Sequence, residues 1–356
     1  MRNHLAAFAV ATAICGQAAW ATDYTIDTYD FPGAATTGVT GINAAGRIVG
    51  NYTVSGTTTA GLFGLFGFTE RNGIYTSVGD SLPCRPSGRC RTGVQFLNNF
   101  GLFAGAFSGD VDFPGAFSQT VDSAPAVVQP PEYPDTDVIL GGLNDLGELA
   151  GCYSNPDLPF HIFTQIGGQF RTISLPAADA LTFCPVFLNN LGQLAGQYET
   201  SGVFHGFILT GSHLRTLDLP AAWNGEEILP LAINDLGFVT GTYEAADPLG
   251  VTQTHGFVAH GDQIDKIDFP GAISTSPSAI NNRGEVLGTY EIATTDPVGV
   301  ATQTFTFRAG VYSTVTLPLP GPGPVFIGGF DNFGRLFGSY TDSVGTHGFV
   351  ATPKAD

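Results

Sequence analysis

Positive charge is scarce in this sequence. Its 356 residues include 13 lysines and arginines against 31 aspartates and glutamates, which gives a formal net charge of −18. The basic residues gather only once, at Arg85, Arg89 and Arg91. Proteins hold DNA, RNA and anionic lipid surfaces mainly through clustered lysine and arginine, so this balance argues against all three as partners.

Catalytic and metal-binding signatures are also missing. The sequence has no Gly-x-Ser-x-Gly, no His-Glu-x-x-His and no phosphate-binding glycine loop. Neither Cys-x-x-Cys nor a pair of closely spaced histidines is present, which argues against zinc. We therefore predict no catalytic residue and no cofactor, with Ca²⁺, considered below, as the one exception.

Long hydrophobic runs are confined to the amino terminus. Arg2 precedes an apolar run at residues 5–15, and Ala19-Trp20-Ala21 has the small-x-small form of a cleavage site. The run is too short to span a membrane, and no later stretch has the character of a span. We predict a signal peptide at residues 1–21 and a single exported domain at residues 22–356, which is periplasmic or extracellular and monomeric.

Four cysteines follow the predicted leader, an even number that suits an oxidising compartment. Cys84 and Cys90 bound a short loop, and Cys152 and Cys184 lie on strands that we expect to be neighbours. We predict the disulfides Cys84–Cys90 and Cys152–Cys184, the second of which would stabilise the fold by about 3–4 kcal/mol.

Glycine, proline and phenylalanine are abundant, with 48, 23 and 28 copies, as is typical of an all-β protein rich in turns. One motif recurs seven times: apolar-Asn-x-x-Gly, then x-apolar-x-Gly-x-Tyr, as in residues 233–243. The copies are 45 to 55 residues apart, a period typical of an array or a propeller. Their turn residues are Asn43, Asn98, Asn144, Asn189, Asn234, Asn281 and Asp331.

The motif predicts a strand, a tight turn and a second strand. The Asn side chain can accept a hydrogen bond from the backbone two residues on, and the Gly three residues after it tolerates a positive φ. The Gly of the second strand, Gly241 in this copy, would weaken that strand unless a neighbour approaches closely. We interpret this glycine and the tyrosine that follows it as packing residues.

Each unit supplies four antiparallel strands, A to D. In the fourth unit we expect them at residues 183–189, 193–198, 204–209 and 214–219. Strand C carries a His-Gly-Phe signature, which we align with Phe305-Thr306-Phe307 in the sixth unit, and a link such as Asp268-Phe269-Pro270-Gly271-Ala272 leads from strand D to the next unit. The region 121–134 of the second unit is rich in proline and predicts a poor D strand.

The ends of the chain indicate how the units are joined. Residues 24–34 form a D strand and its link without strands A, B and C before them, whereas the last unit has A, B and C but no D. We therefore predict a seven-bladed β-propeller of four-stranded antiparallel blades, in which the N-terminal strand completes the last blade.

The Ile-Asn-x-x-Gly-x-x-x-Gly-x-Tyr, His-Gly-Phe and Asp-x-Pro-Gly-Ala elements together resemble the bacterial extracellular HAF-repeat family. The resemblance covers residues 23–352. It implies a secreted bacterial β-propeller-like repeat protein and no particular reaction. The second and sixth C strands lack the histidine, which argues against one histidine-dependent function shared by every repeat.

His161, His205, His255 and His347 occupy one equivalent position in four units. Equivalent positions in a ring are too far apart to share one metal, so we expect each imidazole to bond a backbone group beside its B–C loop.

Carboxylates are the stronger candidates for a site. The B–C and D–A loops should emerge on the same face, which would gather an acidic rim there. Hard cations take carboxylate and carbonyl oxygens, so this rim is either a solvated surface or a Ca²⁺ or glycan site. The candidate metal ligands are Glu244, Asp247, Glu291 and Asp296. The other rim carboxylates are Asp30, Asp157, Glu199, Asp218, Glu226, Glu227, Asp268 and Asp342.

The sequence predicts a non-catalytic binding or scaffold protein that presents the B–C/D–A face to a glycan, a peptide or a surface partner. The alternative is a polysaccharide lyase or hydrolase, which depends on fold analogy alone. A structural component of the cell surface is a third reading.

Overall fold

The computed structural model describes residues 23–54, 65–79, 82, 91–108, 115–133, 136–155, 158–175, 184, 186–247, 249–295 and 298–354. These segments form strands and one short 3-10 turn, η1 (Ala221–Trp223), with no α-helix among them. Accordingly, no helix in the described ranges could cross a membrane. The predicted signal peptide and the predicted Cys84–Cys90 bridge lie outside these residues.

Five of the six sheets are four-stranded, antiparallel and built from consecutive strands. The first is β6 (Arg91–Leu97), β7 (Phe103–Ser108), β8 (Gly115–Gln119) and β9 (Ala126–Val128). The second is β10 (Asp137–Leu143), β11 (Leu149–Asn155), β12 (Leu158–Ile166) and β13 (Gln169–Ile173). The third is β14 (Val186–Leu188), β15 (Gln193–Thr200), β16 (Val203–Thr210) and β17 (His213–Leu217). The fourth is β18 (Gly225–Ile233), β19 (Val239–Ala246), β20 (Thr252–His260) and β21 (Gln263–Ile267). The fifth is β22 (Ser274–Ile280), β23 (Val286–Thr295), β24 (Val298–Arg308) and β25 (Val311–Thr314).

The sixth sheet joins both ends of the chain. It contains β1 (Tyr24–Tyr29), β2 (Thr36–Ile42), β3 (Ile48–Thr53), β4 (Leu65–Arg71), β5 (Ile74–Val78), β26 (Val325–Phe330), β27 (Leu336–Thr341) and β28 (Thr346–Pro353). Strand β1 runs antiparallel to β28, from Tyr24 opposite Pro353 to Tyr29 opposite Gly348. A single parallel pair, Thr36 with Thr346, links β2 to β28.

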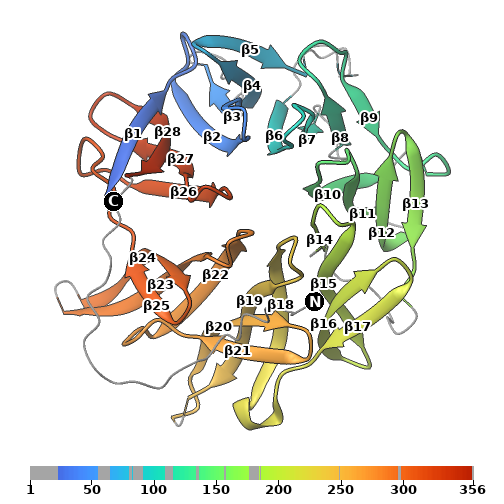
Figure 1. The fold of residues 1–356 in the computed structure, drawn as a ribbon, viewed down its shortest axis with the longest axis vertical. Helices are drawn as coiled ribbons and strands as arrows, with labels where there is room; N and C mark the ends of the chain where they lie inside the picture. The colour runs from blue at the N-terminus through green and yellow to red at the C-terminus, as the bar shows by residue number, and fades with distance from the viewer. Residues whose placement is uncertain are drawn as a thin grey trace, which may run out of the picture.

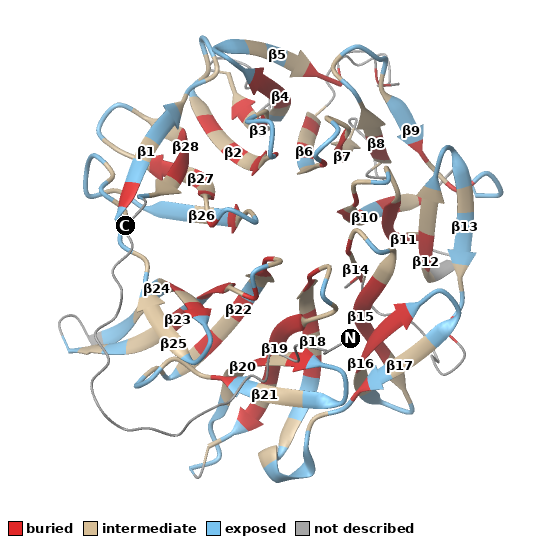
Figure 2. Cartoon of the chain, in the orientation of Figure 1, coloured by how far each residue is buried: buried red, intermediate tan, exposed pale blue. Residues whose placement is uncertain are grey.

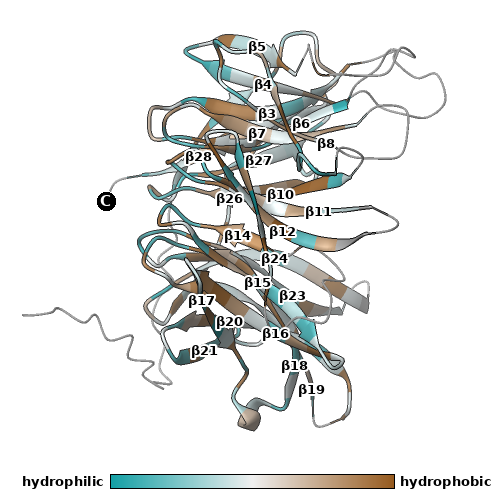
Figure 3. Ribbon diagram, turned by 90° about the vertical axis from the view of Figure 1, so that its right-hand side faces the viewer, coloured by the Kyte–Doolittle hydropathy of each residue, from teal (hydrophilic) through white to brown (hydrophobic). Residues whose placement is uncertain are grey.

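The sheets stand around a common centre (Figure 1). The first strand of each group lies innermost and the last lies outermost, with β1 outside β28. The buried residues follow the strands where neighbouring sheets face each other (Figure 2). In the side view of Figure 3, hydrophobic segments run along β3 and β10 within the stack of strands. The predicted all-β architecture of four-stranded antiparallel sheets is confirmed.

Packing between strands explains the repeated Gly and Phe. The Phe of strand C is fully buried in every copy of the repeat, at Phe68, Phe117, Phe163, Phe207, Phe257, Phe305 and Phe349. A Cβ atom on Gly241 of strand B would collide with the Leu229 carbonyl oxygen of strand A, and the equivalent collision occurs at Gly50, Gly105, Gly151, Gly288 and Gly338. The predicted close approach to these glycines is therefore confirmed, and the neighbour is the backbone of strand A.

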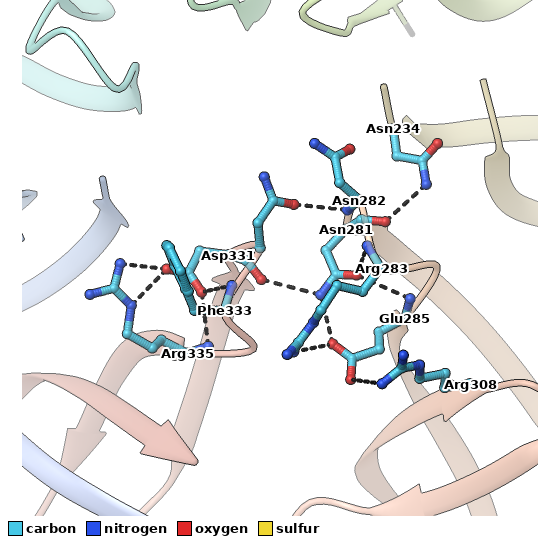
Figure 4. Close-up of polar contacts among 10 residues, drawn as sticks. Asn234, Asn281, Asn282, Arg283, Glu285, Arg308, Asp331, Phe333 and Arg335 are labelled. Atoms are coloured by element: carbon cyan, nitrogen blue, oxygen red, sulfur yellow. Dashed lines mark hydrogen bonds and ion pairs between the residues drawn. The ribbon is translucent and has the colours of Figure 1, made fainter. Parts of the chain in front are cut away.

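The turn asparagines act as predicted and also bond to the next unit. Asn234 Oδ1 accepts from the N–H groups of Leu236 and Phe238, at 3.0 and 2.9 Å. Its Nδ2 atom donates to the carbonyl of Asn281, the next turn asparagine, at 2.9 Å (Figure 4). The same amide-to-carbonyl bond joins Asn43 to Asn98, Asn98 to Asn144, Asn144 to Asn189, Asn189 to Asn234 and Asn281 to Asp331.

The seventh bond of this series uses a different side chain. Asp331 has no amide to donate, but its carboxylate holds the Arg335 guanidinium, with Nε 2.7 Å from Oδ2. Arg335 Nη2 then donates to the Asn43 carbonyl at 3.0 Å. The series thus returns to the unit where it began.

The predicted strands of the fourth unit agree with β14 to β17 to within a few residues. The poor D strand of the second unit is also confirmed, since β9 has only three residues. Residues 244–254 and 291–304, however, are not mainly loops. They extend β19 with β20, and β23 with β24, as paired strands, and the second of these stretches is rich in Thr and Val, which suit extended pairing.

A disulfide joins two sheets as predicted. Cys152 of β11 bonds Cys184, which precedes β14, with a Cα–Cα distance of 5.7 Å.

Candidate functional site

Three of the C-strand histidines pair with the aspartate that ends strand D of the same sheet. His205 Nδ1 lies 2.7 Å from Asp218, and His255 Nδ1 lies 3.1 Å from Asp268. His347 of β28 reaches Asp30 at 3.0 Å, across the junction between the two ends of the chain. The expectation of a backbone partner for these rings is therefore wrong, because the D–A link carries a carboxylate within reach.

His347 has a second carboxylate partner, Asp342, whose Oδ1 lies 3.2 Å from Nε2. Partial burial by itself would lower the pKa of the imidazole, but hydrogen bonds and charge from Asp30 and Asp342 outweigh it and raise that pKa. Hydrogen bonds from the backbone N–H groups of Val344 and Gly345 lower the pKa of the Asp342 carboxyl, and the interaction with His347 lowers it further.

The D–A link places one residue, two or three positions after strand D, at the junction to the next sheet. In two links it is phenylalanine: Phe31 stacks on Tyr52 and Phe269 stacks on Tyr290, each with ring centroids 3.7 Å apart. In three links it is leucine, at Leu175, Leu219 and Leu317. Leu175 is buried in a hydrophobic cluster, whereas Leu219 and Leu317 each line a cleft. At these two junctions the smaller side chain leaves space that the aromatic ring fills elsewhere.

The first cleft, which we call the acidic cleft, lies between the β14–β17 and β18–β21 sheets and has a volume of about 450 Å³. Its lining comprises residues 202–205, Asp218, Leu219 and residues 225–228, which include Glu226 and Glu227. Asp218, Glu226 and Glu227 are all exposed. Glu227 has a positive φ of 52°, which is rare and costly for a residue with a Cβ atom.

The second cleft, which we call the neutral cleft, lies between the β22–β25 sheet and β26 and has a volume of about 690 Å³. Its polar lining consists of Thr289, Thr302, Gln303, Thr304, Thr314 and Thr316, and its apolar lining of Val315, Leu317, Val325, Phe326 and Ile327. No charged side chain is among them.

Strand register shows that the two clefts are equivalent places in two units. Tyr198 pairs with His205, and Tyr290 pairs with Gln303. The sixth unit therefore has Gln303 where the fourth has His205. By the pairing of the D strands, Thr316 stands in the place of Asp218. The sequence alignment of the sixth C strand on Phe305-Thr306-Phe307 was wrong by two residues, because this strand has phenylalanine at both 305 and 307 and Phe305 is the one equivalent to Phe207.

The proposed metal ligands do not assemble into a site in the described chain. Glu244 and Glu291 lie within strands β19 and β23, and the Glu244 carboxylate accepts from the Thr254 hydroxyl at 2.8 Å. Asp247 Oδ1 caps a turn through the N–H groups of Leu249 and Val251. Asp296 and Asp157 lie outside the described residues. Within those residues no three His, Cys, Asp or Glu side chains are placed to hold a metal ion, so the Ca²⁺ site stays a prediction.

The mouth of the central opening, on the side of the A–B turns, is a third cavity of about 360 Å³. The side chains that follow the turn asparagines line it and bond to one another. Asp145 accepts from Asn99, and Asp235 accepts from both Asn190 and Asn282. Because these groups satisfy each other, this cavity is a weaker candidate than the two clefts on the opposite face.

No protein-family model and no curated protein sequence matches the chain. Several solved structures are similar to it. The β-propeller domain of the Trilobed protease from Pyrococcus furiosus matches with a TM-score of 0.59 at 8% identity, over 91% of this chain and 97% of that one. An oligogalacturonate lyase in complex with manganese gives 0.54 at 10% identity, over 93% and 97%.

A prolyl endopeptidase structure gives a TM-score of 0.56 at 11% identity over 90% of this chain, which spans only 51% of that protein. At such low identities these matches show the fold alone. The chain has a β-propeller fold.

Proposed function

We propose that this protein is a secreted, seven-bladed β-propeller that binds an extracellular ligand without transforming it. The binding face is the one on which the B–C and D–A loops emerge. A ligand would lie at junctions between blades, where the D–A link carries leucine in place of phenylalanine.

Two features support seven blades and a closed ring. Strand β1 adds an outer strand to β26–β28, which makes a seventh group of four from the two ends of the chain. The turn-to-turn hydrogen bonds pass through seven units and return to Asn43 through Arg335. Closure of this kind removes free sheet edges, which are sites of aggregation.

The acidic cleft is the observation that carries the binding proposal. It combines an apolar floor at Leu219 and Ile228 with the exposed carboxylates of Asp218, Glu226 and Glu227. The strained backbone of Glu227 fits a functional position, since such strain is retained where its surroundings enforce it. Asp218 is paired with His205, but Glu226 and Glu227 form no ion pair among the described residues. These two carboxylates favour a ligand with a positive charge, such as a peptide carrying lysine or arginine.

An array test separates this proposal from a purely structural role. The mature chain, residues 22–356, is applied to peptide and glycan arrays, together with a Glu226→Gln/Glu227→Gln variant and a Leu219→Phe variant. We expect retention of basic peptides that weakens about tenfold or more in both variants, with no decrease in melting temperature. Glu132→Gln, an exposed change outside both clefts, is the control. Equal retention by all forms, or none by the wild type, would reject the acidic cleft.

One observation favours the alternative of a polysaccharide lyase or hydrolase. His205 is oriented by Asp218 inside a cleft, as a general base requires. Incubation with neutral and acidic polysaccharides, followed by assay of new chain ends, tests it. Turnover that His205→Ala abolishes would replace the binding proposal with an enzymatic one.

We also propose membership of the HAF-repeat family and export with cleavage near Ala21. The repeat elements described above support the family, and the Cys152–Cys184 disulfide is compatible with an oxidising compartment. Mass spectrometry of the exported protein should find a chain that begins near Thr22, and size-exclusion chromatography should find a monomer. An intact amino terminus on cytoplasmic protein would contradict export.

A further inference from the structure

The neutral cleft exposes a part of the blade that is buried in other units. Tyr340 pairs with Val325, so Val325 is equivalent to Thr37, Thr92, Val138, Ile228 and Thr275, all of which are 2–3% exposed. Val325 is 48% exposed and its neighbour Phe326 is 66% exposed. The inner strand β26 is therefore uncovered on the side that faces β24 and β25.

At this junction the turn asparagines bond as elsewhere, but a B-strand bond between sheets that three other units make has no counterpart in the described residues. In the B strands, Asn51 bonds the Val94 backbone, Cys152 forms its disulfide, and Gln197 donates to the Ile228 carbonyl at 2.7 Å. Thr289 occupies the equivalent position in β23, opposite Ser276 of β22. Its side chain is exposed, and its hydroxyl makes no hydrogen bond among the described residues. This hydroxyl is therefore available to a ligand.

The lining of the cleft has a specific chemistry. Thr289, Thr302, Thr304, Thr314 and Thr316 supply hydroxyl groups that both donate and accept, and Gln303 supplies an amide. Tyr290 keeps two of these groups in place, through Gln303 Oε1 at 2.6 Å and Thr314 Oγ1 at 2.9 Å. The exposed ring of Phe326 offers an apolar face.

The absence of charge in the neutral cleft limits the class of ligand that it can bind. The protein carries a net charge of −18, yet the cleft has neither carboxylate nor cation in its lining. Acidic polymers would find no cation there, and basic peptides would find no carboxylate of the kind that lines the acidic cleft. Hydroxyl groups beside an apolar ring suit a neutral, polyhydroxylated molecule, and about 690 Å³ is within the size range of ligand sites.

We propose that the neutral cleft is a binding site for a neutral oligosaccharide. One sugar ring packs its C–H face on Phe326, and the threonine hydroxyls and Gln303 exchange hydrogen bonds with its hydroxyl groups. This site is separate from the acidic cleft, and the inference rests on the binding role proposed above, to which it adds the class of ligand.

Titration calorimetry with neutral hexasaccharides tests the proposal: cellohexaose, xylohexaose, mannohexaose, laminarihexaose and chitohexaose. We expect at least one of them to bind the mature chain. Phe326→Ala should weaken that binding about tenfold through the loss of ring contact. Leu317→Phe should abolish it, because the ring would fill the cleft as Phe269 fills its own junction. Affinity should be unchanged between roughly 50 and 500 mM salt, since no charge is involved.

Two matched controls isolate the site. Phe100→Ala removes an exposed ring in an A–B turn on the opposite face, and Leu219→Phe fills the acidic cleft; both should bind the hexasaccharide like the wild type. Binding by none of the five sugars, equal loss in Phe100→Ala and Phe326→Ala, or loss in Leu219→Phe without loss in Leu317→Phe would each overturn the proposal. The first two outcomes would not contradict binding at the acidic cleft, because that proposal is tested with basic peptides and with other variants.

Discussion

The acidic and neutral clefts occupy the same place in two units and differ in nearly every side chain that faces the ligand. His205 and Asp218 in one become Gln303 and Thr316 in the other. The strands that carry them keep the same pairing, the same buried Phe and the same turn. The contrast shows that the framework of the unit is fixed by packing, whereas the rim on the B–C/D–A side is free to vary.

A second contrast separates both clefts from the filled junctions. Where the D–A link carries Phe31 or Phe269, the ring stacks on the next unit's tyrosine. Where it carries Leu219 or Leu317, the leucine lines a cleft, although the equivalent Leu175 is buried. The link residue therefore contributes to how completely a junction is filled, together with the side chains around it.

The largest effect on stability should come from removing the disulfide that joins two neighbouring sheets. Replacing Cys152 and Cys184 with alanine together removes the covalent tie at the position that Thr289 leaves open. We expect a loss of about 3–4 kcal/mol in the free energy of unfolding, because the released loop gains entropy in the unfolded chain. Urea unfolding measures it. Titration of the unreduced wild type under denaturing conditions should find no free thiol, and two or more would contradict the pairing.

Removing the aromatic ring from a filled junction should lower the free energy of unfolding by a smaller amount. Phe269→Ala removes the ring that stacks on Tyr290, and we expect a loss of about 2–3 kcal/mol, somewhat below that of a fully buried phenylalanine. Leu317→Ala, in the link that borders the neutral cleft, should cost clearly less because that side chain fills its junction incompletely. Equal losses in the two variants would show that the junctions do not differ as described.

The wall of the neutral cleft is anchored on its other side by Arg335. Arg335→Ala breaks the bond to the Asn43 carbonyl and leaves the Asp331 carboxylate without its cation, so we expect a loss of about 1–3 kcal/mol. Thermal unfolding measures the shift. Arg283→Ala is the control, since its pairing with Glu285 is exposed and should contribute under about 1 kcal/mol. A larger loss in Arg283→Ala would contradict the role of Arg335.

Converting a binding junction into a filled one should stabilise the protein. In Leu219→Phe and Leu317→Phe the added ring can stack on the next unit, as Phe269 does, and we expect gains of about 0.5–1.5 kcal/mol. Differential scanning calorimetry measures them. Loss of stability in both variants would show that something other than the link residue opens the clefts.

The smallest effect concerns the histidine–aspartate pair that the neutral cleft has lost but the neighbouring blade keeps. The pKa of His347 is raised in the folded protein, so its stabilising contribution is complete below the unfolded value of about 6.5 and is lost as pH rises through the folded pKa. His347→Gln should therefore lower the melting temperature more near about pH 5.5 than near about pH 8.5, by about 1–2 °C. A larger drop in melting temperature at the higher pH would contradict the raised pKa of His347.

The sequence predicted the strands, the turns and the Cys152–Cys184 bridge because their signals lie within one unit or between adjacent units. It could not predict the bond from Asn234 to the Asn281 carbonyl, since its two partners are a full repeat apart and nothing local requires it. The pairing of His205 with Asp218 was within reach, because units with the aspartate also have the histidine and the sixth has neither. The clefts were missed because the Phe-to-Leu change in the link matters only once the neighbouring tyrosine is placed.

Both ends of the described chain meet at one point, where the Lys354 N–H bonds the Asp23 carbonyl at 2.8 Å. A short linker from Lys354 to Asp23, with new ends cut into the exposed Gly211–Ser212 turn between β16 and β17, should give a circularly permuted protein with the same folded structure.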